Sequence, residues 1–188
     1  MLRALSVESG PCTGVHVFQV DERVVPAEHP DRNLTHLKES LVENAPLRPE
    51  QIHAMPVESF DLGAAATLHA NEIGVVVGSP PVLDMIPLGL GSDGHTASLV
   101  LGDAVLDVTG DDVAMTAAYQ GRRRMTLTYP ILNRARRILW VVTGKGKMEM
   151  VSRLYKGDIS IPAGRVHRNQ AFLLADCEAV GQRASEYQ

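Results

Sequence analysis

Short runs of apolar and β-branched residues recur along this chain and predict buried strands. Each run is only a few residues long and leads into a charged residue or a glycine, as strands of a parallel sheet commonly do. Pro87 lies inside one of them, and because proline has no N–H to donate, we expect that strand to bend or to end early. The predicted strands occupy residues 15–20, 82–91, 136–144 and 170–176, with a neighbouring pair at 112–119 and 124–129.

Between the strands, three segments have the spacing or the composition of helices. Residues 33–44 carry leucines and a valine at helical spacing, and Asn33 is expected to cap this helix. Residues 61–73 are rich in alanine, the strongest helix former. Residues 147–157 are expected to place four apolar side chains on one face: Met148, Val151, Leu154 and Tyr155.

Strands that alternate with helices predict βαβ units, and therefore an α/β fold with a mostly parallel sheet covered by helices on both faces. In open sheets of this kind, ligands bind at the carboxyl ends of the strands. Three predicted strands lead into polar, glycine-rich or charged segments there: DERVVP at 21–26, GLGSDGH at 89–95 and TGKGK at 143–147. We therefore expect these segments to meet around one shared pocket.

Composition narrows the class of protein. A length of 188 residues favours one domain over 1–188 with a substantial core, and a net charge of −4 argues against a nucleic-acid surface. No apolar run approaches the length of a membrane span. Cys12 and Cys177 lie far apart and outside any CxxC spacing, so we expect idle or buried thiols in a reducing cytoplasm.

The stretch LGLGSDGHTASL at 88–99 carries the most chemistry. Its glycines allow a tight turn and bring backbone N–H groups near a ligand, and a helix that begins near Gly94 would favour an anion there. His95 is a candidate general base, although most histidines are exposed or satisfied within a core. Asp93 is expected either to cap that helix or to orient the His95 imidazole.

Two further segments carry guanidinium and ammonium groups. Arg23 suits a carboxylate, a phosphate or a polarised carbonyl, but a surface ion pair between Glu22 and Arg23 explains the same residues. Lys147 follows a glycine turn at a predicted helix start, which suits a single phosphate. The three arginines at 122–124 resemble a solvated turn. Neither a nucleotide-triphosphate loop nor a metal-ligand spacing occurs in the sequence.

Together, these motifs resemble the 6-phosphogluconolactonase family, which is related to glucosamine-6-phosphate deaminase. VHVFQVDERVVP, HPDRN, LGLGSDGHTASL, RMTLT and GKGKMEMV stand in the family's order and spacing, from about Leu2 to about Asp176. The resemblance implies a Rossmann-like α/β sheet in a single domain. It implies a carboxylic-ester hydrolase of the oxidative pentose phosphate pathway that acts on a phosphorylated sugar lactone without metal or organic cofactor.

By the same resemblance, His95 activates water, and Asp93 and Asp21 share the catalytic role. Substrate binding would fall to five residues: Arg23, Gly91, Gly94, Arg124 and Lys147. We expect no nucleic-acid or membrane partner, and a monomer or a homodimer.

The chain also departs from the family pattern. The family opens with a strand and a GGSTP-like phosphate loop, and no such segment stands here, so we expect an N-terminal βα unit to be missing and activity to be weakened. A sugar-phosphate-binding or subunit-interaction protein with a degraded site is the alternative. An isomerase-deaminase ranks lower, because Arg23 and Val100 stand where that relative has a tyrosine and an acid.

Overall fold

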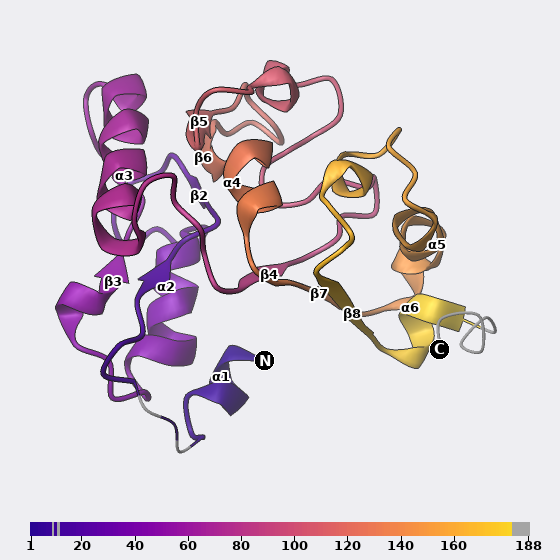
Figure 1. The fold of residues 1–188 in the computed structure, drawn as a ribbon, viewed down its shortest axis with the longest axis horizontal. Helices are drawn as coiled ribbons and strands as arrows, with labels where there is room; N and C mark the ends of the chain where they lie inside the picture. The colour runs from indigo at the N-terminus through magenta and orange to yellow at the C-terminus, as the bar shows by residue number, and fades with distance from the viewer. Residues whose placement is uncertain (9, 11, 182–188) are drawn as a thin grey trace.

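The computed structural model describes residues 1–8, 10 and 12–181. Figure 1 shows α3 at one side of the molecule, α5 and α6 at the other, and α4 between them. The α-helices are α1 (Leu2–Leu5), α2 (Asn33–Leu37), α3 (Leu62–Val77), α4 (Tyr129–Arg134), α5 (Met148–Lys156) and α6 (Cys177–Val180). Five shorter turns of 3-10 or π type are η1 (Lys38–Val42), η2 (Pro49–Gln51), η3 (Ala104–Asp107), η4 (Lys145–Lys147) and η5 (Pro162–Arg165).

The described strands form three ladders. Two are parallel, with the strand orders β1-β3 and β4-β7-β8, and the third is antiparallel with the order β2-β6-β5. The α/β class with parallel pairing is therefore confirmed, although the parallel strands lie in two separate ladders. The strands are β1 (Val17–Phe18), β2 (Asp21–Arg23), β3 (Ile52–His53), β4 (Ile86–Leu88), β5 (Val113–Met115), β6 (Arg124–Leu127), β7 (Ile138–Val142) and β8 (Ala171–Ala175).

Strand β4 shows how Pro87 is accommodated in a parallel ladder. Ile86 donates its N–H to the Arg137 carbonyl beside β7, and Pro87 stands opposite Leu139. Because alternate residues of a parallel strand face opposite neighbours, the missing N–H of Pro87 points away from β7. Within the described residues β4 pairs only with β7, so no ladder bond is lost, and the strand ends early at Leu88 as expected.

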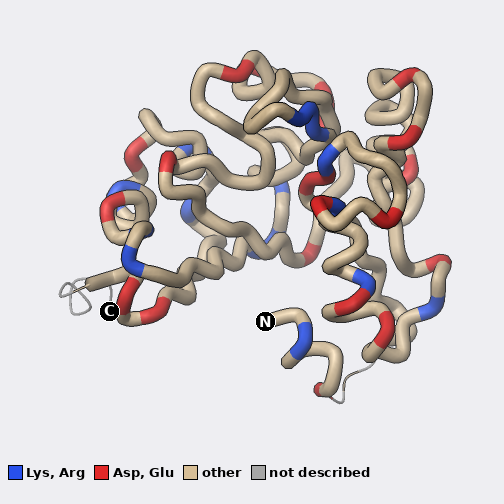
Figure 2. Tube along the Cα trace, turned by 180° about the vertical axis from the view of Figure 1, so that it is seen from behind, with Lys and Arg blue, Asp and Glu red and all other residues tan. Residues whose placement is uncertain are grey.

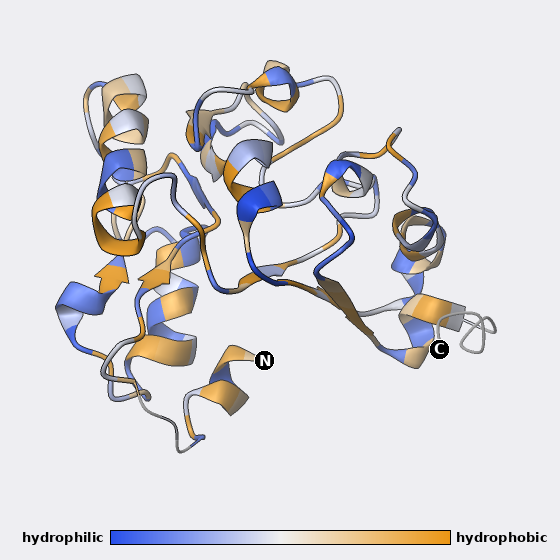
Figure 3. Cartoon of the chain, viewed as in Figure 1, coloured by the Kyte–Doolittle hydropathy of each residue, from blue (hydrophilic) through white to orange (hydrophobic). Residues whose placement is uncertain are grey.

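Strand β7 and helix α5 supply much of the apolar interior, whereas β8 is only partly buried and leaves Phe172 and Leu174 exposed. Both strands have hydrophobic colours along their length in Figure 3, and Ile138, Trp140 and Val142 are buried. One cluster of buried hydrophobic residues extends from 55 to 179. A single domain over 1–188 stays a prediction.

The buried face of α5 differs from the predicted one. Val151 and Leu154 are buried as expected, together with Met150, but Met148 and Tyr155 are exposed. The helix begins at Met148, and Met150, Val151 and Leu154 form the i, i+1, i+4 pattern that faces the core. The predicted buried face of this helix is therefore partly wrong, because two of its four residues are exposed to solvent.

The start of α2 is capped from a distance. Asn33 is the first helical residue rather than the cap, so the predicted cap is wrong. The buried Glu22 carboxylate accepts the backbone N–H groups of Asn33 and Leu34, at 2.9 and 2.8 Å, and stands 3.3 Å from the Arg32 Nε. This carboxylate therefore supplies the acceptor that a local cap would provide.

A chain of hydrogen bonds joins α3 to the β1-β3 ladder. The ring nitrogens of His16 and His53 lie 2.9 Å apart, and Glu72 contacts both His53 and His69, at 2.6 and 3.0 Å. Phe18 stacks on His53 with ring centroids 4.2 Å apart. His16 is exposed, whereas His53 and His69 are buried, and the His69 Nε2 has no hydrogen-bond partner among the described residues.

Charge is distributed without a single basic face. In Figure 2 the basic and acidic positions are interspersed along the trace. No helix among the described residues is long and apolar enough to cross a membrane.

Candidate active site

The three strand-end segments meet in one cavity of about 350 Å³, a size that admits a small ligand. Its walls come from the end of the β1 segment and β2, from β4 and its following turn, from the first residue of β6, and from Lys147 before α5. Six of the eight predicted site residues line it. The lining residues are Val20, Asp21, Arg23, Asn33, Pro87, Leu88, Gly89, Leu90, Gly91, His95, Ala97, Arg124 and Lys147.

The segment after β4 forms a series of turns and no helix. Gly94 has φ +83° and Ala97 has φ +50°, values that interrupt a right-handed helix, and Thr96 pairs with Leu99 in an isolated antiparallel bridge. The expectation of a helix near Gly94 is therefore wrong, and no helix dipole acts at His95. The N–H groups of two of the three glycines are already used within the turn, because Gly91 donates to the His95 carbonyl and Gly94 to the Gly91 carbonyl.

Gly91 and Gly94 of this turn differ in what surrounds them. A Cβ on Gly91 would lie 2.1 Å from the His95 Nδ1 and 2.5 Å from the Asp93 Oδ1. Gly91 therefore makes room for the His95–Asp93 pair. Gly94 lies outside the cavity lining, where a Cβ would meet Ile161 at 2.7 Å, so the structure gives it a packing role and does not bring it to the ligand.

His95 and Asp93 form a hydrogen-bonded pair at the cavity. The Asp93 Oδ1 lies 2.5 Å from the His95 Nδ1 and 3.2 Å from the His95 backbone N, and the Asp93 Oδ2 accepts the Tyr119 hydroxyl at 3.1 Å. Burial alone would raise the pKa of Asp93, but the hydrogen bonds from His95 and Tyr119 lower it below its usual value. Asp93 is thus an ionised acceptor that orients the imidazole, and the helix-capping alternative does not apply.

Asp21 is a second carboxylate of the cavity, in a drier setting. Ser98 donates its hydroxyl to the Asp21 Oδ2 at 2.6 Å, and Asn33 donates its amide to Oδ1 at 3.0 Å. Burial raises the pKa of Asp21, against the hydrogen bond from Ser98 and the charge of Arg124, whose Nη1 lies 3.9 Å away. The two carboxylates therefore differ in proton affinity, an arrangement typical of sites with divided acid and base roles.

Arg124 and Lys147 supply positive charge to the same cavity. Arg124 is the first residue of β6 and is 6% exposed, so the arginine run at 122–124 is not wholly a solvated turn. Burial lowers its pKa, and within the described residues its Nε has no hydrogen-bond partner. A buried guanidinium with an unused donor beside a cavity fits an anionic ligand.

The side chain of Arg23 is held in place by neighbours other than Glu22. Its Nη1 donates to the Asp31 carbonyl at 2.7 Å and to the Asn33 Oδ1 at 3.0 Å. The side chain of Glu22 has no exposed surface and faces Arg32, so the alternative of a surface ion pair between Glu22 and Arg23 is wrong. Residues 21–23 are therefore not a loop after the preceding strand. They form strand β2, which pairs with β6 in an antiparallel ladder.

Three residues at the site were not predicted as site residues: Ser98, Asn33 and Tyr119. Ser98 and Asn33 hold Asp21, whereas Tyr119 contacts the His95–Asp93 pair and Arg124. The position of Ser98 three residues after His95 was a usable signal. Nothing in the sequence near Tyr119 indicates that its turn reaches the segment after β4.

Comparisons with known proteins agree with this architecture. The chain belongs to the family described as glucosamine-6-phosphate isomerases/6-phosphogluconolactonase, which matches residues 1–174. Among similar proteins, a 6-phosphogluconolactonase of Synechocystis sp. is 34% identical over 159 residues, which are 82% of this chain and 66% of the relative. A 6-phosphogluconolactonase of Mycobacterium tuberculosis is 32% identical over 199 residues, 98% of this chain and 81% of the relative.

A solved structure is also similar along most of the chain. The crystal structure of 6-phosphogluconolactonase from Thermotoga maritima superposes with a TM-score of 0.81 at 25% identity, covering 93% of this chain and 78% of that one. The chain spans slightly less than two thirds of the length of its relatives from Synechocystis sp. and Nostoc sp..

Proposed function

We propose that this protein hydrolyses 6-phosphogluconolactone to 6-phosphogluconate in the oxidative pentose phosphate pathway. The observation that carries the proposal is the convergence of the His95–Asp93 pair with Arg124 and Lys147 on one cavity. A lactone needs a base for water and a fixed position for its carbonyl, and a phosphorylated lactone adds an anionic handle. The names of the similar proteins support the same substrate.

His95 acts as the general base in this proposal. Its Nδ1 faces Asp93, so Nε2 is the nitrogen left to accept a proton from water. The water oxygen forms a bond to the lactone carbonyl carbon, and the bond from that carbon to the ring oxygen then breaks. The proton held on His95 passes to the ring oxygen, which leaves as a hydroxyl, and the new acid ionises to the carboxylate.

Positive charge positions the substrate. Arg124 presents an unused Nε and lies beside the cavity with Lys147, so together they hold the 6-phosphate. Arg23 is fixed by Asn33 and Asp31 and faces the polarised carbonyl in this proposal. Asp21, held by Ser98 and Asn33, accepts a hydrogen bond from a hydroxyl of the sugar.

We also propose a cytoplasmic location and a monomeric or homodimeric state. Both cysteines are unpaired, which suits a reducing compartment.

The test is a direct assay of lactone opening. The lactone is generated freshly, and its hydrolysis is followed near neutral pH with and without the purified chain, because the lactone also opens spontaneously. The wild type is expected to accelerate hydrolysis, and His95→Gln is expected to lose the excess rate while it still binds 6-phosphogluconate. Binding of 6-phosphogluconate by the wild type without any rate increase refutes the lactonase and favours a sugar-phosphate-binding protein.

A further inference from the structure

The turn between β5 and β6 places Tyr119 in contact with both the His95–Asp93 pair and Arg124. Tyr119 and Arg122 exchange backbone hydrogen bonds of 3.0 and 3.2 Å, and the two residues between them, Gln120 and Gly121, both have positive φ. This is the pattern of a type I′ turn, whose backbone twist matches that of the flanking antiparallel strands. Arg122 also pairs with Asp31 at 2.7 Å, which ties the turn to the segment that holds Arg23.

The hydroxyl of Tyr119 is directed at the catalytic pair. It donates to the Asp93 Oδ2 at 3.1 Å, while the Asp93 Oδ1 faces the His95 Nδ1. The two carboxylate oxygens are therefore engaged on opposite sides, which fixes the rotation of the Asp93 carboxylate and with it the plane of the imidazole. Burial and the neighbouring Asp93 charge raise the pKa of Tyr119, so its phenol stays protonated and available as a donor.

The ring of Tyr119 makes two further contacts. Its edge-on contact with the His95 ring has a centroid distance of 5.6 Å, and the guanidinium carbon of Arg124 lies 5.2 Å from the Tyr119 ring centroid. The second contact is a cation–π arrangement within the accepted range. Arg124 has few other polar contacts, since Asp21 is 3.9 Å away and Nε has no partner in the described part of the chain.

We propose that Tyr119 is a positioning residue that aligns the base through its hydroxyl and holds the phosphate-binding arginine through its ring. This inference rests on the proposed function. Tyr119 lies outside the cavity lining, so it acts through Asp93, His95 and Arg124 and does not touch the substrate. The two parts of the side chain therefore have separable effects on turnover and on substrate binding.

Two substitutions separate these effects. Tyr119→Phe keeps the ring and removes the hydroxyl, so kcat is expected to fall about five-fold, with KM changed by less than about two-fold. Tyr119→Leu also removes the ring from Arg124, so KM is expected to rise about three-fold in addition. Tyr129→Phe is the matched control, because it removes a phenol hydroxyl that donates to the Pro162 carbonyl and has no part in the site.

A spectroscopic measurement keeps the inference independent of the activity. In protein labelled with ¹⁵N-histidine, the His95 Nδ1 proton held on Asp93 is expected to give a hydrogen-bonded signal, assigned by its loss in His95→Gln. The signal should broaden or disappear in Tyr119→Phe and persist in Tyr129→Phe. A wild type without lactonase activity refutes the proposed function, and the signal still decides the role of Tyr119. Unchanged kcat and signal in Tyr119→Phe, together with an unchanged KM in Tyr119→Leu, overturn the inference.

Discussion

Replacement of Gly91 by alanine tests the geometry of the base most sharply. The added Cβ would lie 2.1 Å from the His95 Nδ1, 2.4 Å from its Cε1 and 2.5 Å from the Asp93 Oδ1. Non-bonded heavy atoms are comfortable at about 3.5 Å or more, so the pair has to move by about 1 Å. A displacement of that size at a catalytic group costs about a hundred-fold in rate. Gly91→Ala is therefore expected to lower kcat by about that factor.

The assay is the steady-state rate of lactone opening, corrected for spontaneous hydrolysis, together with a thermal melt that shows the variant is folded. Gly110→Ala is the matched control. It adds the same methyl group outside the cavity lining, at a position where no atom lies within 4 Å, and is expected to keep kcat within about two-fold. If Gly91→Ala is folded and retains the wild-type kcat, the placement of His95 against Gly91 is refuted.

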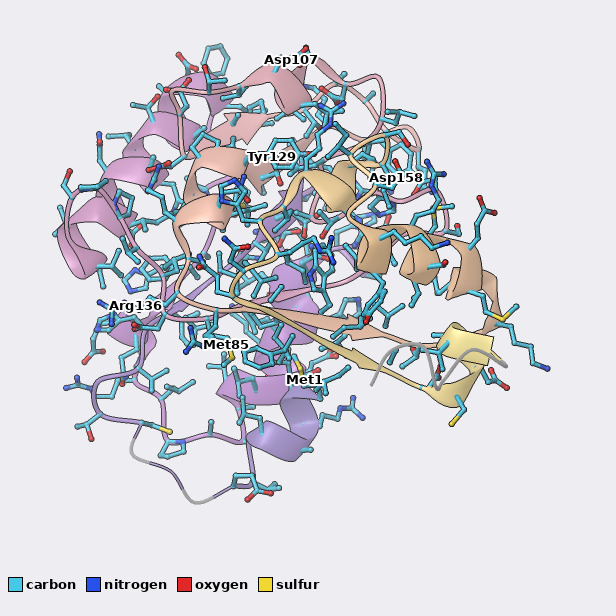
Figure 4. The ribbon with its side chains drawn as sticks, turned by 45° about the vertical axis from the view of Figure 1, so that its right-hand side comes forward. Met1, Met85, Asp107, Tyr129, Arg136 and Asp158 are labelled. Atoms are coloured by element: carbon cyan, nitrogen blue, oxygen red, sulfur yellow. The ribbon has the colours of Figure 1, made fainter. Side chains whose placement is uncertain are left out.

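Three other predictions concern charge and stability. Glu22→Gln removes the buried charge opposite Arg32, and it is expected to lower the free energy of unfolding by about 3 kcal/mol in urea denaturation; a loss below about 1 kcal/mol would contradict the assigned role. Arg124→Lys is expected to raise KM about ten-fold with a smaller change in kcat, because an ammonium group cannot replace a planar fork, and an unchanged KM counts against a phosphate at this position. Figure 4 shows Tyr129 among the packed side chains near α4. Burial raises the pKa of Tyr129 from 10.0 to about 12, so the folded state favours the protonated phenol. Its stabilisation is full below pH 10 and is lost as the pH rises toward 12, so the wild type should lose about 2–3 kcal/mol more than Tyr129→Phe over that interval; parallel curves for the two proteins would refute this.

The sequence predicted the elements whose signals are local. The run of branched residues in β7 and the alanine-rich start of α3 both lie where expected, and the predicted neighbours at 112–119 and 124–129 pair as β5 and β6. The general rule for parallel sheets anticipated that the three segments meet at one cavity, although residues 21–23 lie in the antiparallel ladder β2-β6-β5. These features depend on short-range patterns and on topology.

Other features depend on contacts between distant segments, and the sequence did not reveal them. Glu22 caps α2 from eleven residues away, so the local preference of Asn33 for a cap position was misleading. Positive φ at Gly94 and Ala97 replaces the expected helix with turns that carry His95 toward the cavity. Tyr119 meets Asp93 across 26 positions of the chain, and only the β5–β6 turn brings them together.

A crystal structure of the protein with 6-phosphogluconate tests the central claim most directly. We expect the product carboxylate within hydrogen-bond distance of the His95 Nε2 and the phosphate on Arg124 and Lys147. Two results would contradict the account. One is a phosphate remote from both cations, and the other is a product bound in a separate cavity, which is lined by Phe60, Asp61, Leu62, Gly63 and Arg123.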